Sequence, residues 1–312
     1  MTSIDRSPRA AAPLLVLAGA VLWGTTGTAQ ALGIGGVAGG VPPVAVGAAR
    51  IAVGGAGLLV IAALLRALPR VAMLQQRSIA WALTAGALAI AGYQATFFAG
   101  VDRAGVALGT VVAIGSAPAF TGLVGWAARD ERPEPGWLPA TALAVAGSVL
   151  LLLPHGGVRA DGFGIALTLG AGLCFAVGTV AMKTLLEAGV EPVAVVALIF
   201  SAGAVLASPA LFAVDAGWLL TGRGAATALY LGLAATTVAY VLFSRGLAGV
   251  PSSSAATLAL AEPLTAAALG LLLLAERPGP LGWLGGTLVL TGLVVLAMRH
   301  RRAARAARLA SP

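Results

Sequence analysis

Long apolar segments, separated by short polar breaks, run through almost the whole chain. An α-helix needs about 20 mostly apolar residues to cross the hydrocarbon core of a bilayer. Measured against that length, the pattern predicts an all-α membrane protein with about ten transmembrane helices. The predicted spans cover residues 13–32, 43–65, 79–100, 104–127, 137–153, 162–183, 192–213, 221–244, 252–274 and 279–298.

The composition excludes an ordinary water-soluble domain. Hydrophobic residues make up 59% of the chain and charged residues 10%, and the mean hydropathy is +0.97. Soluble domains carry about 25% charged residues. The net charge of +8 does not indicate a nucleic-acid partner, because the basic residues lie in the breaks between spans rather than along one stripe.

The basic residues predict the orientation of the spans. With the N-terminus inside, the residues on the cytoplasmic side are Arg6, Arg9, Arg66, Arg70, Arg77, Arg129, Arg132, Lys183, Arg245, Arg299, Arg301, Arg302, Arg305 and Arg308. The other side receives only Arg103, Arg159, Arg223 and Arg277. Cytoplasmic loops of membrane proteins carry an excess of Lys and Arg. We therefore expect a multi-pass protein of the inner membrane with both termini in the cytoplasm.

The two ends of the chain are expected to be cytoplasmic tails, residues 1–12 and the basic segment 299–312. Ala29-Gln30-Ala31 resembles a signal-peptidase site, which would make the first span a cleaved signal. The apolar run from Ala11 to Leu32 is long for a signal peptide, so we expect this span to be retained.

The second half of the chain repeats the first, which predicts two units at 13–153 and 162–298. The residues that recur 145 positions later are Pro118, Glu131, Arg132, Pro133 and Gly147, as Pro263, Glu276, Arg277, Pro278 and Gly292. Because each unit has five spans, an odd number, the two copies are expected to lie in opposite orientation across the membrane. Transporters built from inverted repeats bind their solute where the repeats meet.

These residues together resemble the EamA family of the drug/metabolite transporter superfamily, over nearly the whole chain. The features that carry the resemblance are Trp23-Gly24, Arg50, Pro118, Glu131-Arg132-Pro133, Glu262-Pro263, Glu276-Arg277-Pro278 and Gly292. The resemblance implies two inverted five-helix units, a central cavity lined mainly by spans one, three, four, six, eight and nine, and transport of amino acids or other small metabolites. The chain departs from the family pattern at Cys174-Phe175-Ala176, where the second copy often carries a tryptophan.

Two charged residues fall well inside predicted spans, away from their ends. A carboxylate near the middle of the ninth span, Glu262, is costly to bury and indicates a function. Our hypothesis is that Glu262 binds a proton or a cationic part of the solute and couples transport to the proton gradient. A structural carboxyl beside the Pro263 kink is an equally open alternative. Arg50 lies near the start of the second span, within snorkelling reach of the interface, so we expect a structural charge, with pairing to Glu262 or to a helix C-terminus as the alternative.

Mid-helix prolines and polar residues complete the candidate site. Pro118 and Pro263 each remove a helical hydrogen bond and are hinge candidates, with simple packing kinks as the alternative. The residues predicted to line a cavity are Trp23, Thr26, Gln30, Tyr93, Gln94, Ser116, Tyr240, Ser253 and Thr257. For each serine and threonine, a hydrogen bond to its own helix backbone is the alternative.

The sequence offers no catalytic constellation, metal site or cofactor motif. Cys174 is the single cysteine, and the two histidines, His155 and His300, are far apart. We therefore expect a secondary transporter, not an enzyme, that exports an amino acid or related solute by alternating access. Its partners are expected to be membrane lipid and a small-molecule substrate, without nucleic acid. A lipid-flipping or accessory subunit is the first alternative, and a membrane-embedded enzyme is the second.

Overall fold

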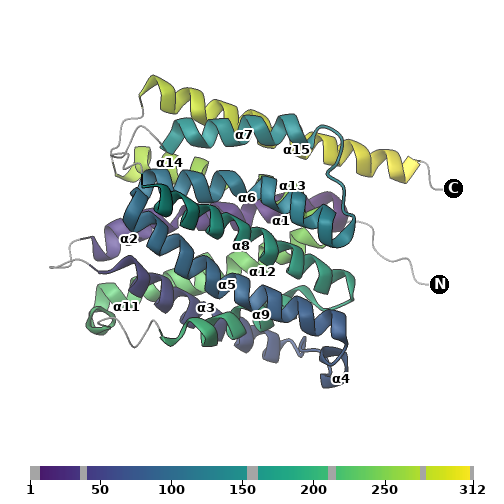
Figure 1. Cartoon of the computed structure of the whole chain (residues 1–312), viewed down its shortest axis with the longest axis horizontal. Helices are drawn as coiled ribbons and strands as arrows, with labels where there is room; N and C mark the ends of the chain where they lie inside the picture. Colours follow the sequence, from purple (N-terminus) through teal and green to yellow (C-terminus); the bar gives the residue numbers. More distant parts are fainter. Residues whose placement is uncertain (1–7, 36–40, 153–160, 210–215, 275–278, 310–312) are drawn as a thin grey trace.

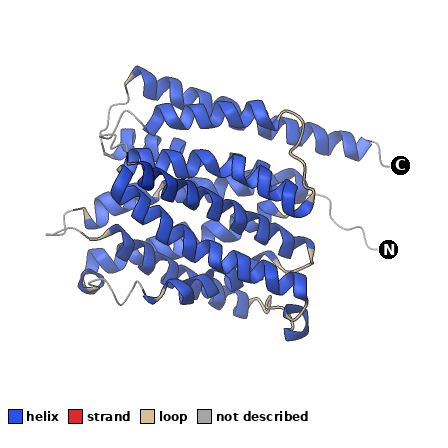
Figure 2. Ribbon diagram, viewed as in Figure 1, coloured by secondary structure: helices blue, strands red, loops and turns tan. Residues whose placement is uncertain are grey.

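The computed structural model describes residues 8–35, 41–152, 161–209, 216–274 and 279–309, and within these ranges it contains helices and loops but no strand (Figures 1 and 2). The elements in chain order are α1 (Pro8–Gly24), α2 (Thr26–Ile34), α3 (Pro43–Leu64), α4 (Val71–Leu74), α5 (Arg77–Ala104), α6 (Val106–Arg129), α7 (Trp137–Leu152), α8 (Gly162–Glu187), α9 (Pro192–Ala207), η2 (Gly217–Leu220), α11 (Gly222–Leu229), η3 (Tyr230–Val238), α12 (Ala239–Leu247), α13 (Ser252–Leu258), α14 (Ala261–Leu273) and α15 (Pro280–Leu309).

The prediction of about ten transmembrane helices is confirmed. In the described part of the chain, 8 helical segments are long and apolar enough to cross a membrane. The remaining two spans, α7 and α9, are apolar helices of 16 residues each. The seventh span was predicted to reach residue 213, whereas α9 ends at Ala207, and residues 210–215 lie outside the described ranges.

Three spans combine more than one helical element. The first consists of α1 and α2, the eighth of α11, η3 and α12, and the ninth of α13 and α14. The first and ninth spans are each broken inside a segment that the hydrophobic pattern presents as one continuous span, whereas the eighth is helical throughout and π-helical in its middle. An interrupted helix within a membrane is tolerated where protein or a cavity satisfies the backbone groups that the break frees.

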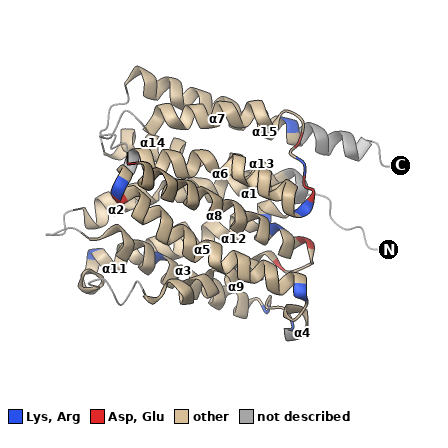
Figure 3. Cartoon of the chain, viewed as in Figure 1, with Lys and Arg blue, Asp and Glu red and all other residues tan. Residues whose placement is uncertain are grey.

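The outer surface of the bundle suits a lipid environment. Large apolar side chains are exposed on its outside, including Val60, Leu64, Leu138, Leu272 and Trp283. Charged residues gather at the two ends of the bundle (Figure 3). A surface of this kind would aggregate in water, but it meets lipid tails without cost.

The two halves of the chain are inverted relative to each other. Helix α1 begins and α15 ends at the same end of the bundle (Figure 1), here called the terminal end; the other is the opposite end. Helix α1 packs on α12 as α8 packs on α5, while α3 packs on α9 and α7 on α15. Exchanging the first five spans with the second five reproduces these pairings. This reciprocity confirms the predicted inverted repeats.

Candidate functional site

Two adjoining cavities lie between the halves of the protein, with volumes of about 80 and 250 Å³. The first cavity reaches toward the terminal end, where Thr179, Met182 and Ala256 line it. The second extends toward the opposite end, to Gln30 of α2 and Pro43 at the start of α3. The residues that line both cavities are Trp23, Arg50, Tyr93, Gln94, Ile114 and Glu262. These shared residues form one polar centre, here called the central cavity.

The break in the ninth span brings Glu262 to the central cavity. Pro263 has no backbone N–H and cannot donate to the carbonyl of Ala259. The N–H of Glu262 donates to that carbonyl instead, at 2.9 Å, and Leu260 donates to the carbonyl of Thr257 at 3.0 Å. This tight turn separates α13 from α14. Pro118, at the equivalent position of the first repeat, lies inside the continuous helix α6, so the two prolines have different local effects.

The break in the first span lies against the start of α14. A Cβ atom added to Gly24 would lie 2.6 Å from the backbone oxygen of Glu262, so only glycine allows this approach. The hydroxyl of Thr25, in the break itself, donates to the carbonyl of Leu22 at 2.7 Å. The hydroxyl of Tyr230, at the start of η3, contacts Thr25 Oγ1 at 2.8 Å. The break in the first span therefore contacts both the start of α14 and the start of η3.

A π-helical segment, η3, positions Tyr240 in the eighth span. The hydroxyls of Thr236 and Thr237 donate to carbonyls five residues earlier, at 2.8 and 3.1 Å. Thr237 also contacts the carbonyl of Gly54 in α3, at 3.0 Å. Segments of π-helix are rare and often occur at functional sites. Tyr240 follows directly in α12 and lines the first cavity.

Aromatic rings form one wall of the central cavity. The Trp23 ring centroid lies 4.7 Å from that of Tyr240 and 5.1 Å from that of Phe243. Tyr240 also packs on Phe200 of α9, with ring centroids 4.1 Å apart. This packing fixes the orientation of Trp23, which is 6% exposed.

Arg50 and Glu262 bring opposite charges to the central cavity. Nη2 of Arg50 donates to Oε1 of Gln94 at 3.4 Å. The carboxyl group of Glu262 interacts electrostatically with the positive charge of Arg50. In the described ranges, however, neither side chain forms an ion pair. Both charges thus remain directed to the cavity.

Several buried polar atoms of the cavity walls have no hydrogen-bond partner. They are Trp23 Nε1, Thr26 Oγ1, Arg50 Nε, Gln94 Nε2 and Thr179 Oγ1. Buried polar groups are nearly always paired in native structures, so such a group marks a place for water, an ion or a ligand. The walls of the two cavities therefore carry polar groups that a bound water or solute could pair.

Most of the predicted cavity residues line the two cavities. They are Trp23, Thr26, Gln30, Tyr93, Gln94 and Tyr240, together with Glu262. Arg50, expected to be structural, also lines both cavities. The hinge candidates Pro118 and Pro263 are not part of the lining.

Three predicted residues lie outside the lining. Ser116 donates to the carbonyl of Ala113 at 3.3 Å. Thr257 Oγ1 accepts a hydrogen bond from Trp137 Nε1 at 3.0 Å. Ser253 is buried, and its carbonyl also accepts from Trp137 Nε1, at 3.1 Å. Ser116 thus bonds within its own helix, as the alternative expectation had it, whereas the contacts of Thr257 and Ser253 with Trp137 join α13 to α7.

Sequence reasoning missed the part of the lining that comes from α8 and α9. The missed residues are Cys174, Phe175, Gly178, Thr179, Met182 and Phe200. The departure at Cys174-Phe175-Ala176 was one available signal, since it implied that the first and sixth spans contribute unequally. Among the described residues there is no cluster of His, Cys, Asp and Glu that could hold a metal.

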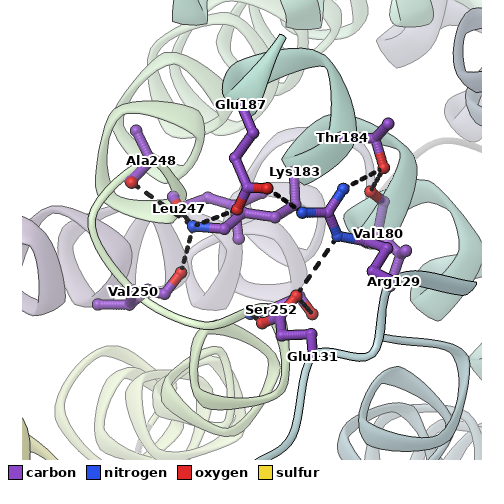
Figure 4. Close-up of polar contacts among 10 residues, drawn as sticks. All are labelled: Arg129, Glu131, Val180, Lys183, Thr184, Glu187, Leu247, Ala248, Val250 and Ser252. Atoms are coloured by element: carbon purple, nitrogen blue, oxygen red, sulfur yellow. Dashed lines mark hydrogen bonds and ion pairs between the residues drawn. The ribbon is translucent and has the colours of Figure 1, made fainter. Parts of the chain in front are cut away.

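Ion pairs and hydrogen bonds link the two repeats at the terminal end (Figure 4). Arg129, the last residue of α6, donates to Thr184 Oγ1 at 2.8 Å and pairs with Glu187. Oε2 of Glu131 accepts from the hydroxyl of Ser252 at 2.9 Å, and Oε1 accepts from the N–H of Ser252. Each contact joins the first repeat to the second.

Lys183 completes this arrangement from α8. Its Nζ donates to the carbonyls of Leu247 and Val250, at 2.9 Å each, and lies 3.6 Å from Glu187. Lys183 thereby holds the end of α12 and the loop before α13. We call Arg129, Glu131, Lys183, Thr184, Glu187 and Ser252 the terminal-end network.

A family model, a relative of known sequence and a solved structure each match nearly the whole chain. The model of the EamA-like transporter family matches residues 10–153 and 162–298. An uncharacterized transporter of Bacillus subtilis, YwfM, is 42% identical over 95% of this chain and 97% of its own. The uncharacterized inner membrane transporter YicL of Salmonella typhimurium is 29% identical over 71% of this chain and 73% of its own. A solved crystal structure shares the fold with a TM-score of 0.78 at 21% identity, covering 94% of this chain and 99% of that one.

Proposed function

Because the chain belongs to the EamA-like transporter family and is a multi-pass membrane transporter, we propose that it exports a small metabolite, an amino acid or related solute, by secondary transport across the inner membrane. The observation that carries this proposal is the central cavity, which lies between two inverted repeats and is lined by both. Arg50 and Glu262 give it two charged groups inside the membrane, where such residues usually mark a solute or ion pathway.

Alternating access follows from the inverted repeats. Rocking one repeat against the other opens a central site first to one side of the membrane and then to the other. The terminal-end network, which joins Arg129 and Glu131 to the second repeat, holds one side closed. The second cavity extends toward the opposite end, as expected for the state from which an exporter releases its solute. By the positive-inside rule, the closed side and both termini are cytoplasmic.

Glu262 is the coupling residue in this proposal. Its carboxyl lies in the central cavity, next to the turn between α13 and α14. Protonation would remove one of the two charges in the cavity and so change both solute binding and the packing of α14. Pro263 is the hinge of the ninth span in this scheme, and Pro118 is the hinge of the fourth.

The alternative functions fit the cavity less well. A membrane-embedded enzyme needs clustered acid, base or nucleophilic groups, whereas Arg50 and Glu262 are the only charged residues among the described lining of the two cavities. A lipid-flipping or accessory subunit does not require a polar cavity between two repeats.

A metabolite screen followed by flux measurements tests the proposal. Cells that lack the protein and cells that overproduce it are compared for released and retained metabolites. Each candidate is then measured in proteoliposomes, with and without a pH gradient. We expect at least one small solute to cross faster than in protein-free vesicles. Unchanged metabolites in the cells, or lipid scrambling without solute flux, would contradict a metabolite transporter.

A further inference from the structure

Arg50 is a half-buried cation that forms no ion pair within the described ranges, although Glu262 lines the same two cavities. Arg50 lies in the first part of α3 and lines both cavities. Its contact with Gln94 is a hydrogen bond to a neutral amide, at 3.4 Å, and its Nε has no partner. A guanidinium that is partly removed from water and hydrogen-bonded to a neutral amide is stabilised further by an anionic ligand.

From this arrangement we propose that Arg50 binds a carboxylate group of the transported solute, an inference that rests on the proposed transport function. Arg50 is then a specificity-determining residue rather than a structural charge. Gln94 is a positioning residue, because its amide oxygen holds the guanidinium toward the cavity.

The unpaired polar atoms around Arg50 favour an anion. Nε1 of Trp23, Nε of Arg50 and Nε2 of Gln94 are all hydrogen-bond donors that cannot accept. The amide orientation of Gln94 is fixed by the bond that its Oε1 accepts from Arg50, which leaves Nε2 as the free donor. Trp23 and Gln94 are only 6% and 8% exposed. A carboxylate, with two oxygens and several lone pairs, can satisfy such a set of donors.

The charge balance of the cavity favours one carboxylate over a phosphate. Among the described residues that line the two cavities, Arg50 is the one cation and Glu262 is the one carboxyl group. A phosphate dianion would be repelled by Glu262 and only half neutralised by Arg50. A planar carboxylate matches the guanidinium fork and carries a single charge. The remainder of the solute would face the Trp23 and Tyr240 rings.

Paired ligands that differ only in this group test the proposal. The full chain, purified in detergent micelles, is heated with increasing 3-phenylpropionate or 3-phenylpropionamide, L-leucine or L-leucinamide, and inorganic phosphate. A ligand that binds the folded state raises the unfolding temperature. We expect at least one acid to stabilise the protein at concentrations about tenfold lower than its amide, and phosphate to have no effect.

Four variants test whether the stabilisation by acids arises from binding in the cavity. R50Q should lose the preference for acid over amide, while R50K should keep the preference but bind about tenfold more weakly, because it keeps the charge without the fork. W23F removes only the indole N–H, retains a ring against Tyr240 and should weaken acid binding. R103Q is the matched control, since Arg103 lies at the opposite end, does not line either cavity and pairs with Asp161 at 3.5 Å.

Several results would overturn the carboxylate site. They are equal stabilisation by acid and amide, no stabilisation by either acid, unchanged acid binding in R50Q, or phosphate binding that depends on Arg50. If R50Q does not fold, a loss of acid preference in R50K is the contrary result. Flux in wild-type proteoliposomes is measured separately. Flux without acid preference would contradict only the carboxylate site, whereas absence of flux would contradict the proposed transport function.

Discussion

Gly147 of α7 and Gly292 of α15 make the same close contact from opposite repeats. A Cβ atom added to either glycine would lie 2.6 Å from a backbone oxygen of the other helix, that of Gly285 or of Ala140. Ala140 and Gly285 are themselves 145 positions apart, as the two glycines are. The pseudo-two-fold axis thus passes between α7 and α15, at the place where the backbones of these two helices are in close contact.

Alanine at either glycine should destabilise the protein to a similar extent. We expect G147A and G292A each to cost about 1–3 kcal/mol, because the helices must separate to admit a methyl group. The measurement is the unfolding temperature in micelles. G162A is the control, since a Cβ atom there would meet nothing within 4 Å. A loss of stability in only one of the two variants would argue against equivalent packing.

Removing the charge of Glu262 should abolish coupling. E262Q keeps the shape of the side chain in the central cavity, so we expect exchange of the solute across proteoliposomes to continue. Stimulation of its transport by a pH gradient should disappear, because an amide cannot release a proton. D130N is the control, at an exposed carboxylate that lies outside both the cavity lining and the terminal-end network. Unchanged pH dependence in E262Q would rule out coupling through this residue.

Loss of Arg129 should open the terminal end. Cys174, the single cysteine, is partly buried and lines the first cavity. In R129A, where the links to Thr184 and Glu187 are absent, we expect Cys174 to react several-fold faster with a membrane-impermeant thiol reagent added on the terminal side.

The labelling experiment has two controls. R132A alters an arginine that is 80% exposed, pairs with Asp130 and does not join the repeats. C174S shows the background without a thiol. Equal labelling of R129A and R132A would mean that the terminal-end network does not close the cavity.

Lys183 should be needed for the stability of the second repeat. It is the only lysine in the sequence, and its amino group satisfies carbonyls of Leu247 and Val250. K183M leaves these acceptors unpaired, at a cost of about 1–3 kcal/mol for each one that stays buried. We expect a lower unfolding temperature and faster hydrogen exchange in the loop before α13. R132M is the exposed control; an unfolding temperature unchanged from the wild type in K183M would show that water replaces the ammonium group.

The sequence by itself determined the spans and the inversion. A backbone inside a bilayer must satisfy its own hydrogen bonds, so each long apolar run is a helix whatever its neighbours are. The repeat of Pro118, Glu131 and Gly147 after an odd number of spans then requires opposite orientations. Glu262 could also be recognised as a candidate functional residue, because a carboxylate in the middle of an apolar run is rare.

Only the tertiary structure decided which polar side chains face the cavity. A membrane helix is apolar toward lipid and toward its neighbours alike, so no contrast along the sequence marks its inner face. Thr257 and Tyr240 were equivalent candidates, yet Thr257 bonds to Trp137 while Tyr240 lines the cavity. The place of Arg50 in the lining of both cavities likewise depends on groups far away in the chain. Such contacts arise when the spans pack, and no local pattern encodes them.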